Sequence, residues 1–281
     1  MIDIPQVRSL VALALAEDLP SGDITAELTI PANAQGAAKI IAREELVLCG
    51  VDISKIVSDV SGWELKINRL KNDGDLVKPE TEVVELSGSV RHLLSLERTI
   101  LNFMQRMSGV ATQARRIVES ADGLTILDTR KTIPGFRALD KYAVKTGGAK
   151  NHRFSLSDMI LVKNNHVDGH PKGLVGVLEE IFAKKPLYMP VEVEVRNQKE
   201  LSEALNFPIS IVMLDNFTPD QIKKAVMDVK AKSAPPLIEV SGGMTPEKLK
   251  AIKAHGVDSV SLGMLTTKAH NCDLSMRILP R

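Results

Sequence analysis

The sequence lacks the features that assign many chains to a class at once. Its 281 residues include only two cysteines, Cys49 and Cys272, which are far apart, so neither a disulfide nor the ligand spacing of a zinc site is expected. Basic residues outnumber acidic ones by only one, 36 against 35, which gives no overall signature of nucleic-acid binding. No run of roughly 18 uncharged apolar residues is present, so no transmembrane helix is expected.

Two further absences narrow the possibilities. Asp3 precedes the first basic residue and no long apolar run follows it, so no signal peptide is expected. No GxGxxG pattern follows a strand-like segment, which weakens the case for a dinucleotide-binding fold. We therefore expect a cytoplasmic protein with two buried thiols and no membrane or nucleic-acid partner.

The first 120 residues predict an α+β domain followed by a long helix. Residues 4–16 have the apolar spacing of an amphipathic helix, with Pro5 in the first turn and Asp3 as a possible cap. Residues 91–119 form a second, longer helical pattern that no proline interrupts, and we interpret it as the bridge between two domains. Between them come four strand-like segments, at 37–43, 45–50, 63–70 and 81–88, and one helical segment, at 51–60.

After residue 120 the pattern changes to a repeated strand and helix. Six short apolar segments alternate with helical ones, which predicts a parallel sheet; six strands over about 140 residues favour a compact barrel. The strands are expected at 124–128, 159–163, 190–195, 210–215, 236–241 and 259–263, and four of the helices at 170–185, 197–206, 218–232 and 245–256.

Polar residues gather where these strands end. In αβ barrels the active site lies at the carboxyl ends of the strands, so these residues are candidates before any family is considered. Glu192 and Glu194 share a face of the third strand because side chains alternate along a strand. The other residues at strand ends are Asp128, Thr129, Arg130, Lys131, Lys163, Asn164, Asn165, His166, Asp215, Asn216, Ser241, Gly242, Gly243 and Gly263.

The segment from Arg130 to Lys163 is strongly basic, with eight lysines and arginines opposed by only two aspartates. Arginine donates paired hydrogen bonds to carboxylate or phosphate and lysine acts as a point charge, so a pocket for a polyanionic ligand is predicted. For Lys141 and Lys145, four residues apart on a predicted helix, a solvent-exposed face is an equally good interpretation.

Several of these candidates have a structural alternative. Glu192 and Glu194 could form a buried ion pair with Lys163. His152 could be a structural histidine, although it stands next to Arg153 in the basic segment. The glycines after the last two strands fit a phosphate-binding turn, in which backbone N–H groups bind the anion, but they also fit ordinary turns.

The stretch LDTRKTIPGFRALDKYAVKTGGAKNHRFSLSDMILVKNNHV resembles the signature region of quinolinate phosphoribosyltransferases. The segments EDLPSGDIT, ERTILNFMQRMSGVAT, VEVEV, VMLDNF, IEVSGGMT and GVDSVSLGMLT extend the resemblance along essentially the whole chain. It implies an N-terminal α+β sandwich domain, an open α/β (TIM-like) barrel, and a C-terminal tail that returns to the first domain. We accordingly expect the first domain at 1–106 with 268–281 and the barrel at 107–267.

The resemblance also implies a reaction. Quinolinate and phosphoribosyl diphosphate would give nicotinate mononucleotide, diphosphate and CO₂ in NAD biosynthesis, with Mg²⁺ required. The assembly would be a homodimer, or a hexamer built from it, with each barrel mouth covered by the partner's N-terminal domain.

Matching positions imply roles for individual residues. Quinolinate would be bound by Arg130, His152, Arg153 and Lys163, and by Arg98 of the neighbouring subunit. Lys131 would lie near the diphosphate, and Glu192 and Asp215 near the ribose and the metal, with Glu192 preferred over Glu194. The loops at Ser241, Gly242 and Gly263 would bind the 5′-phosphate.

Two other functions remain open from the residues. A Schiff-base aldolase on the same barrel would use Lys163 as its nucleophile, since a strand-end lysine beside carboxylates suits that chemistry. A non-catalytic relative of the same fold, like the molybdate-operon homologues, would differ in the basic segment. The intact TRKT and HR elements argue against the second alternative.

Overall fold

The computed structural model describes residues 2–279, which form two compact units. Within the described residues, the first comprises 2–116, 131–149 and 264–279, and the second comprises 117–130 and 150–263. The helix α4, Val90–Ser120, contributes to both, because the division falls after Arg116. The predicted fold, an α+β domain with an α/β barrel-like domain, is confirmed, while the predicted domain boundaries stay a prediction.

The first unit is built on an antiparallel sheet in the order β12-β1-β5-β3. Its last strand along the chain pairs with its first, Ala38 opposite Ile278, so the C-terminal segment returns to this unit as expected. The elements are α1 Pro5–Asp18, α2 Ile24–Thr29, β1 Gln35–Ala42, β2 Leu46–Val47, α3 Ile53–Ser61, β3 Lys66–Arg69, β4 Leu76–Val77, β5 Glu82–Ser89, α5 Arg137–Thr146, α11 Met264–Thr267 and β12 Leu274–Ile278.

The first helix forms where its apolar spacing predicts, and Val7, Val11 and Leu15 are its buried residues. The predicted cap at Asp3 is wrong. Ile4 occupies the cap position without a side-chain hydrogen bond, and the Asp3 carboxylate instead binds Arg8 Nε at 2.6 Å. An ion pair with Arg8 offers this carboxylate two guanidinium donors, whereas a capping role offers one backbone N–H.

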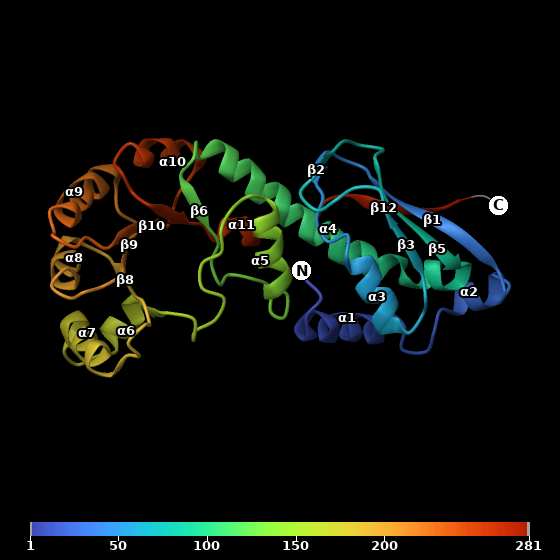
Figure 1. Cartoon of the computed structure of the whole chain (residues 1–281), viewed down its shortest axis with the longest axis horizontal. Helices are drawn as coiled ribbons and strands as arrows, with labels where there is room; N and C mark the ends of the chain where they lie inside the picture. The colour runs from blue at the N-terminus through green and yellow to red at the C-terminus, as the bar shows by residue number, and fades with distance from the viewer. Residues whose placement is uncertain (1, 280–281) are drawn as a thin grey trace. The chain divides into compact units, whose positions relative to one another are not determined.

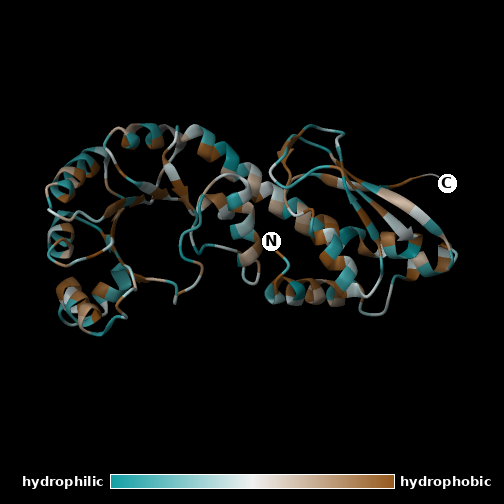
Figure 2. Ribbon diagram, in the orientation of Figure 1, coloured by the Kyte–Doolittle hydropathy of each residue, from teal (hydrophilic) through white to brown (hydrophobic). Residues whose placement is uncertain are grey.

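The second unit contains six parallel strands in the order β6-β11-β10-β9-β8-β7. All six predicted strands are confirmed, and helices lie outside the curved sheet (Figure 1). Figure 2 shows brown and teal residues together on these helices, as expected for helices with one buried face. The elements are β6 Thr125–Leu127, β7 Ile160–Val162, α6 Asn164–Asp168, α7 Gly173–Lys184, β8 Val191–Val195, α8 Gln198–Ala204, β9 Ile211–Asp215, α9 Pro219–Lys230, β10 Leu237–Ser241, α10 Pro246–Lys253 and β11 Ser259–Ser261.

The two faces of this sheet differ in chemistry. Val193, Val212 and Val240, at alternate positions of three neighbouring strands, are fully buried, as expected of the face that the helices cover. Glu192 and Glu239 occupy the intervening positions, which face the other side of the sheet, and they are also buried. A barrel interior is usually filled with branched apolar side chains, so ionisable groups there indicate a functional surface.

Two further predictions from the sequence concern the cysteines and membrane-spanning helices, and the structure bears on both. Cys49 and Cys272 are buried and unpaired, as predicted. In the described part of the chain, no helix has the length and apolarity needed to cross a bilayer.

Candidate active site

A buried cluster of one histidine and two glutamates lies at the centre of the second unit. His152 Nε2 is 2.9 Å from Glu192 Oε2 and 3.8 Å from Glu239 Oε2. The backbone N–H of His152 donates to Asp128 Oδ1 at 2.8 Å, which fixes the residue against the end of β6. Three elements distant in sequence therefore bring these groups together.

Each glutamate of this cluster has one carboxylate oxygen that a ligand could contact. Among the described residues, Glu192 Oε1 and Glu239 Oε1 are buried and have no hydrogen-bond partner. Desolvation by burial and repulsion from the Glu192 carboxylate raise the pKa of Glu239 to about 7. Unsatisfied buried oxygens are costly, so the cluster is suited to receive a hydrogen-bond donor or a cation from a ligand.

The two strand glutamates have different partners. Glu194 forms an ion pair with Lys163 Nζ, whereas Glu192 contacts His152. The suggested pairing of both glutamates with Lys163 is therefore right for Glu194 only. The register explains the difference, because Leu161 of β7 lies opposite Glu192 and Lys163, two residues later, reaches the level of Glu194.

Two arginines add positive charge beside this cluster. Burial, and then repulsion from Arg130, lower the pKa of Arg153, while Glu192 and Asp158 oppose the shift. Among the described residues, Arg130 Nε is a buried donor without a partner, and Arg153 Nη1 donates to the Met159 carbonyl oxygen at 3.2 Å. Two guanidinium groups that repel each other, one with an unused donor, form a site suited to an anionic ligand.

The carboxyl ends of β9 and β10 meet in a second part of the site. Asp215 pairs with Ser241 in the register, and Asn216 N donates to Ser241 O at 3.0 Å. Gly242 has φ +85°, and a Cβ on it would lie 2.2 Å from Asn216 Oδ1. A residue with a side chain here would have to displace the Asn216 side chain and adopt a backbone conformation that favours glycine.

The structure divides the predicted site residues between the two units. Arg130, His152, Arg153, Lys163, Glu192, Asp215, Ser241, Gly242 and Gly263 belong to the second unit, and Arg98 and Lys131 belong to the first. Arg98 is an exposed residue of α4, and the Lys131 carbonyl oxygen accepts a hydrogen bond from Thr266 Oγ1. Lys141 and Lys145, both on α5, differ in exposure: Lys145 is exposed and Lys141 is buried.

Glu192 and Asp215, predicted to share a metal ion, are not adjacent in the sheet. Glu192 lies opposite Ile211, and Asp215 comes four residues later on β9, about 13 Å along the strand. One ion bound directly by both carboxylates does not suit this spacing. Their predicted metal role stays a prediction, and it is more compatible with an ion held largely through water and substrate oxygens.

Glu239 was missed from the sequence, although a signal for it exists. It stands two residues before Ser241 on the same strand, so strand alternation places it on the same face. The same reasoning that selected Glu192 in VEVEV would have selected Glu239 in LIEVS.

Comparison with known proteins identifies the family to which the chain belongs. Residues 23–108 match the family model "Quinolinate phosphoribosyl transferase, N-terminal domain", and residues 110–277 match the corresponding C-terminal domain. The chain belongs to the quinolinate phosphoribosyltransferase family. Together the two matched regions include every predicted site residue, from Arg98 to Gly263.

Members of this family resemble the chain over nearly its full length. A "probable nicotinate-nucleotide pyrophosphorylase (carboxylating)" of Methanocaldococcus jannaschii is 37% identical and covers 95% of each chain. A protein of the same name from Archaeoglobus fulgidus is 38% identical over 93% of this chain and 100% of its own. The solved nicotinate-nucleotide pyrophosphorylase of Francisella tularensis has a TM-score of 0.88 at 38% identity, covering 99% of this chain and 98% of its own.

Proposed function

We propose that this protein transfers the phosphoribosyl group of phosphoribosyl diphosphate to quinolinate and decarboxylates the product. Nicotinate mononucleotide, diphosphate and CO₂ are formed. The observation that carries the proposal is the pair Arg130 and Arg153, two guanidinium groups beside a buried acidic cluster on this family's scaffold. Quinolinate, with two adjacent carboxylates on an aromatic ring, has the charge that such a pair requires.

Substrate binding follows from the basic groups. Arg130 and Arg153 would bind the carboxylates of quinolinate, with His152 and Lys163 at the edges of the ring and Arg98 supplied by a neighbouring subunit. Lys131 would lie near the diphosphate of the second substrate. The turns at Ser241, Gly242 and Gly263 would hold the 5′-phosphate through backbone N–H groups.

In the transfer step the ring nitrogen of quinolinate attacks the anomeric carbon of the ribose. The bond from that carbon to diphosphate breaks, and positive charge develops on the sugar ring. The carboxylates of Glu192 and Asp215 would stabilise this charge electrostatically. The bond from the ring carbon beside this nitrogen to its carboxylate then breaks, and CO₂ leaves. The electron pair stays on that carbon, stabilised by the adjacent positively charged nitrogen, until a proton from solvent is added there.

Magnesium is proposed as the cofactor. Carboxylate oxygens such as Glu192 Oε1 are ligands of the type that Mg²⁺ prefers, and Glu192 and Asp215 would hold the ion together with water and substrate oxygens. When bound, the ion would stabilise the charge of the leaving diphosphate.

The aldolase alternative is not favoured. The lysine that would serve as its nucleophile, Lys163, is held by Glu194 in an ion pair and so is not directed at a substrate carbonyl. The family membership also argues against it. A non-catalytic relative is not favoured either, because the basic residues of TRKT and HR are intact.

We further propose a homodimer, or a hexamer built from such dimers, in which each active site uses Arg98 of the neighbour. The exposure of Arg98 on α4 leaves its side chain free to reach another chain. A cytoplasmic location is proposed as well, because two unpaired buried cysteines are typical of a reducing compartment.

The test is release of labelled CO₂ from carboxyl-labelled quinolinate. We expect release only when phosphoribosyl diphosphate and Mg²⁺ are both present, with nicotinate mononucleotide formed in equal amount. Quinolinate binding without release would indicate the non-catalytic relative. Absence of binding as well would mean that the basic groups serve a different anion.

A further inference from the structure

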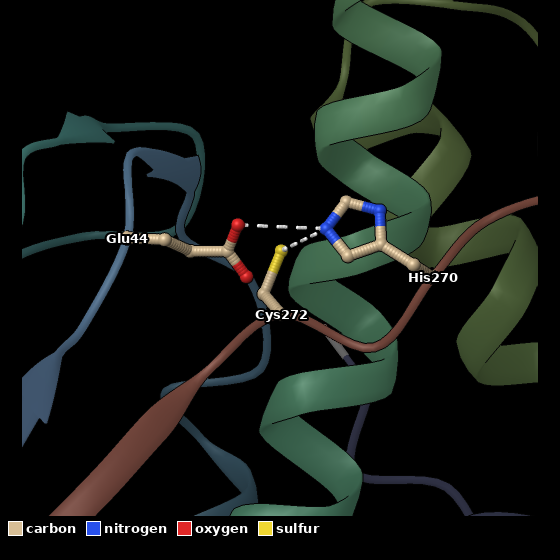
Figure 3. Close-up of side chains that lie close together, drawn as sticks. All are labelled: Glu44, His270 and Cys272. Atoms are coloured by element: carbon tan, nitrogen blue, oxygen red, sulfur yellow. Dashed lines mark hydrogen bonds and ion pairs between the residues drawn. The ribbon is translucent and has the colours of Figure 1, made fainter.

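The first unit contains a separate cluster of titratable side chains next to its last strand. Glu44 lies between β1 and β2, and His270 and Cys272 precede β12. His270 Nε2 lies 3.6 Å from Glu44 Oε2 and 3.9 Å from Cys272 Sγ. Figure 3 shows the carboxylate, imidazole and thiol converging from two segments that are distant in sequence.

Backbone contacts hold the segment that carries His270 and Cys272. Cys272 N donates to Gln105 O at 3.1 Å, and Gln105 Nε2 donates to Leu274 O at 2.8 Å. At Gly109 of α4, an added Cβ would lie only 1.8 Å from His270 O, so the segment packs directly on the helix backbone. The positions of the histidine and the cysteine are therefore set by packing and do not depend on their contact with each other.

Glu44 is oriented by an equally specific set of bonds. Arg43 N donates to Asp273 O at 2.9 Å, and Asp273 N donates to Glu44 Oε1 at 2.7 Å. The second bond occupies one carboxylate oxygen and leaves Oε2 facing His270. A hydrogen bond that orients a carboxylate in this way is typical of residues that bind metals.

Exposure at the cluster would allow a hydrated ion to enter. The side chains of His270 and Glu44 are 51% and 38% exposed, whereas Cys272 is 1% exposed. The thiol thus forms the closed floor of the cluster, and solvent has access from the histidine and glutamate side.

The donor atoms determine which cation suits the cluster. Sulfur, imidazole nitrogen and carboxylate oxygen are the ligands of zinc, and a tetrahedral ion holds such donors about 3.3 to 3.6 Å apart. The 3.6 and 3.9 Å separations are within a few tenths of an ångström of that range. We propose that Glu44, His270 and Cys272 form a binding site for Zn²⁺ or a chemically similar cation, with water as the fourth ligand.

Binding exchanges a proton for the metal. The Cys272 thiol releases its proton to solvent as the bond from Sγ to the cation forms. The occupied site links the β1–β2 turn to the segment before β12, both within the first unit. The sequence did not reveal it because only one ligand is a cysteine and Glu44 lies far earlier in the chain.

Cobalt(II) tests the proposal directly, because a cobalt–thiolate bond gives a near-ultraviolet charge-transfer band that nitrogen and oxygen ligands do not give. The full chain, stripped with a chelator, is titrated with Co²⁺ and then with Zn²⁺. We expect one bound equivalent with this band, and loss of the band when Zn²⁺ displaces cobalt. His152, Glu192 and Glu239 also lie close enough to share an ion but contain no sulfur, so the band distinguishes the two clusters.

Variants of the three ligands extend the test. Cys272→Ser should abolish the band, and His270→Ala should weaken Zn²⁺ binding by about 100-fold and Glu44→Gln by about tenfold. The matched controls are Glu45→Gln, an exposed neighbour of Glu44, and His255→Ala, and both should keep the band and the affinity. His270 is exposed, so its variant keeps the proposal testable if Cys272→Ser fails to fold.

Stability gives an independent readout. A cation that binds only the folded chain should raise the Tm of the wild type and of the two controls, and should raise that of His270→Ala much less at the same cation concentration. The proposal is overturned if cobalt binds without the band, if His270→Ala binds zinc like the wild type, or if the stripped protein binds neither ion. These outcomes do not bear on the proposed transferase activity.

Discussion

Arg153 offers the most direct residue-scale test of the proposed substrate. Its guanidinium is partly desolvated and repelled by Arg130, so an anion that binds both relieves an existing repulsion. Removing such a charged hydrogen-bond donor in Arg153→Ala should raise the KM for quinolinate by about 10- to 100-fold. Steady-state kinetics would measure this, with Lys145→Ala, an exposed lysine on α5, as the control. An unchanged KM would remove Arg153 from the site.

A second test at a single residue concerns Glu192, whose proposed role is in the chemical step and not in substrate binding. Glu192→Ala should lower kcat strongly, by about 100-fold or more, because a carboxylate that stabilises developing charge is lost. The KM for quinolinate should change little by comparison. Wild-type turnover in this variant would transfer the role to Glu194 or Asp215.

Glu239 makes the stability of the chain depend on pH. Its pKa is raised from 4.5 to about 7 in the folded protein, so the folded state binds the proton more tightly than the unfolded state. The stabilising contribution is fully present below about pH 4.5 and is lost as pH rises through about 7.

The change Glu239→Gln should therefore raise Tm relative to the wild type by several degrees more at pH 8 than at pH 5, because about 2 to 3 kcal/mol of wild-type stability is lost over that interval. Thermal unfolding at the two pH values measures the difference. Glu179→Gln, at an exposed position on α7, should show no such dependence. If the Tm difference between Glu239→Gln and the wild type is the same at pH 5 and pH 8, the raised pKa of Glu239 is contradicted.

At the scale of elements, the packing of the long helix α4 depends on Gly109, where the segment that contains His270 lies against the helix backbone. A Cβ added at Gly109 would collide with the His270 backbone, so the absence of a side chain here lets the two segments pack directly. Gly109→Ala should destabilise the chain by about 3 kcal/mol, because a methyl group must displace packed backbone. Asn102→Ala, at an exposed position on the same helix, should leave Tm almost unchanged. Equal Tm values for the two variants would mean that the segment at His270 can move away.

The elements were largely predictable because their apolar spacing repeats over several residues. All six strands of the parallel sheet could be predicted, while the two-residue strand β4 and the four-residue helix α11 are too short to show a period. Strand ends indicated Arg130, Lys163 and Glu192, but the sequence does not contain the register between strands. It therefore could not show that Glu192 contacts His152 and Glu194 contacts Lys163.

At the scale of the whole molecule, the proposed shared active site can be tested by mixing two inactive proteins. Arg98→Ala and Glu192→Ala damage different chains of the same site, so a dimer containing one of each has one intact site. Random reassociation should restore about a quarter of wild-type activity. Glu192→Ala mixed with His152→Ala should restore none, since both of these residues act within their own chain. Recovery in neither mixture would indicate that Arg98 serves its own subunit.

The pairing of β12 with β1 has a consequence for how the protein is made. Ala38 emerges from the ribosome long before its partner Ile278, which lies far later in the chain. During this interval one edge of β1 stays open, and the sheet of the first unit is completed only after β12 has been synthesised. Exposed strand edges favour association with other chains, so this interval is the stage at which the nascent protein most needs protection by chaperones.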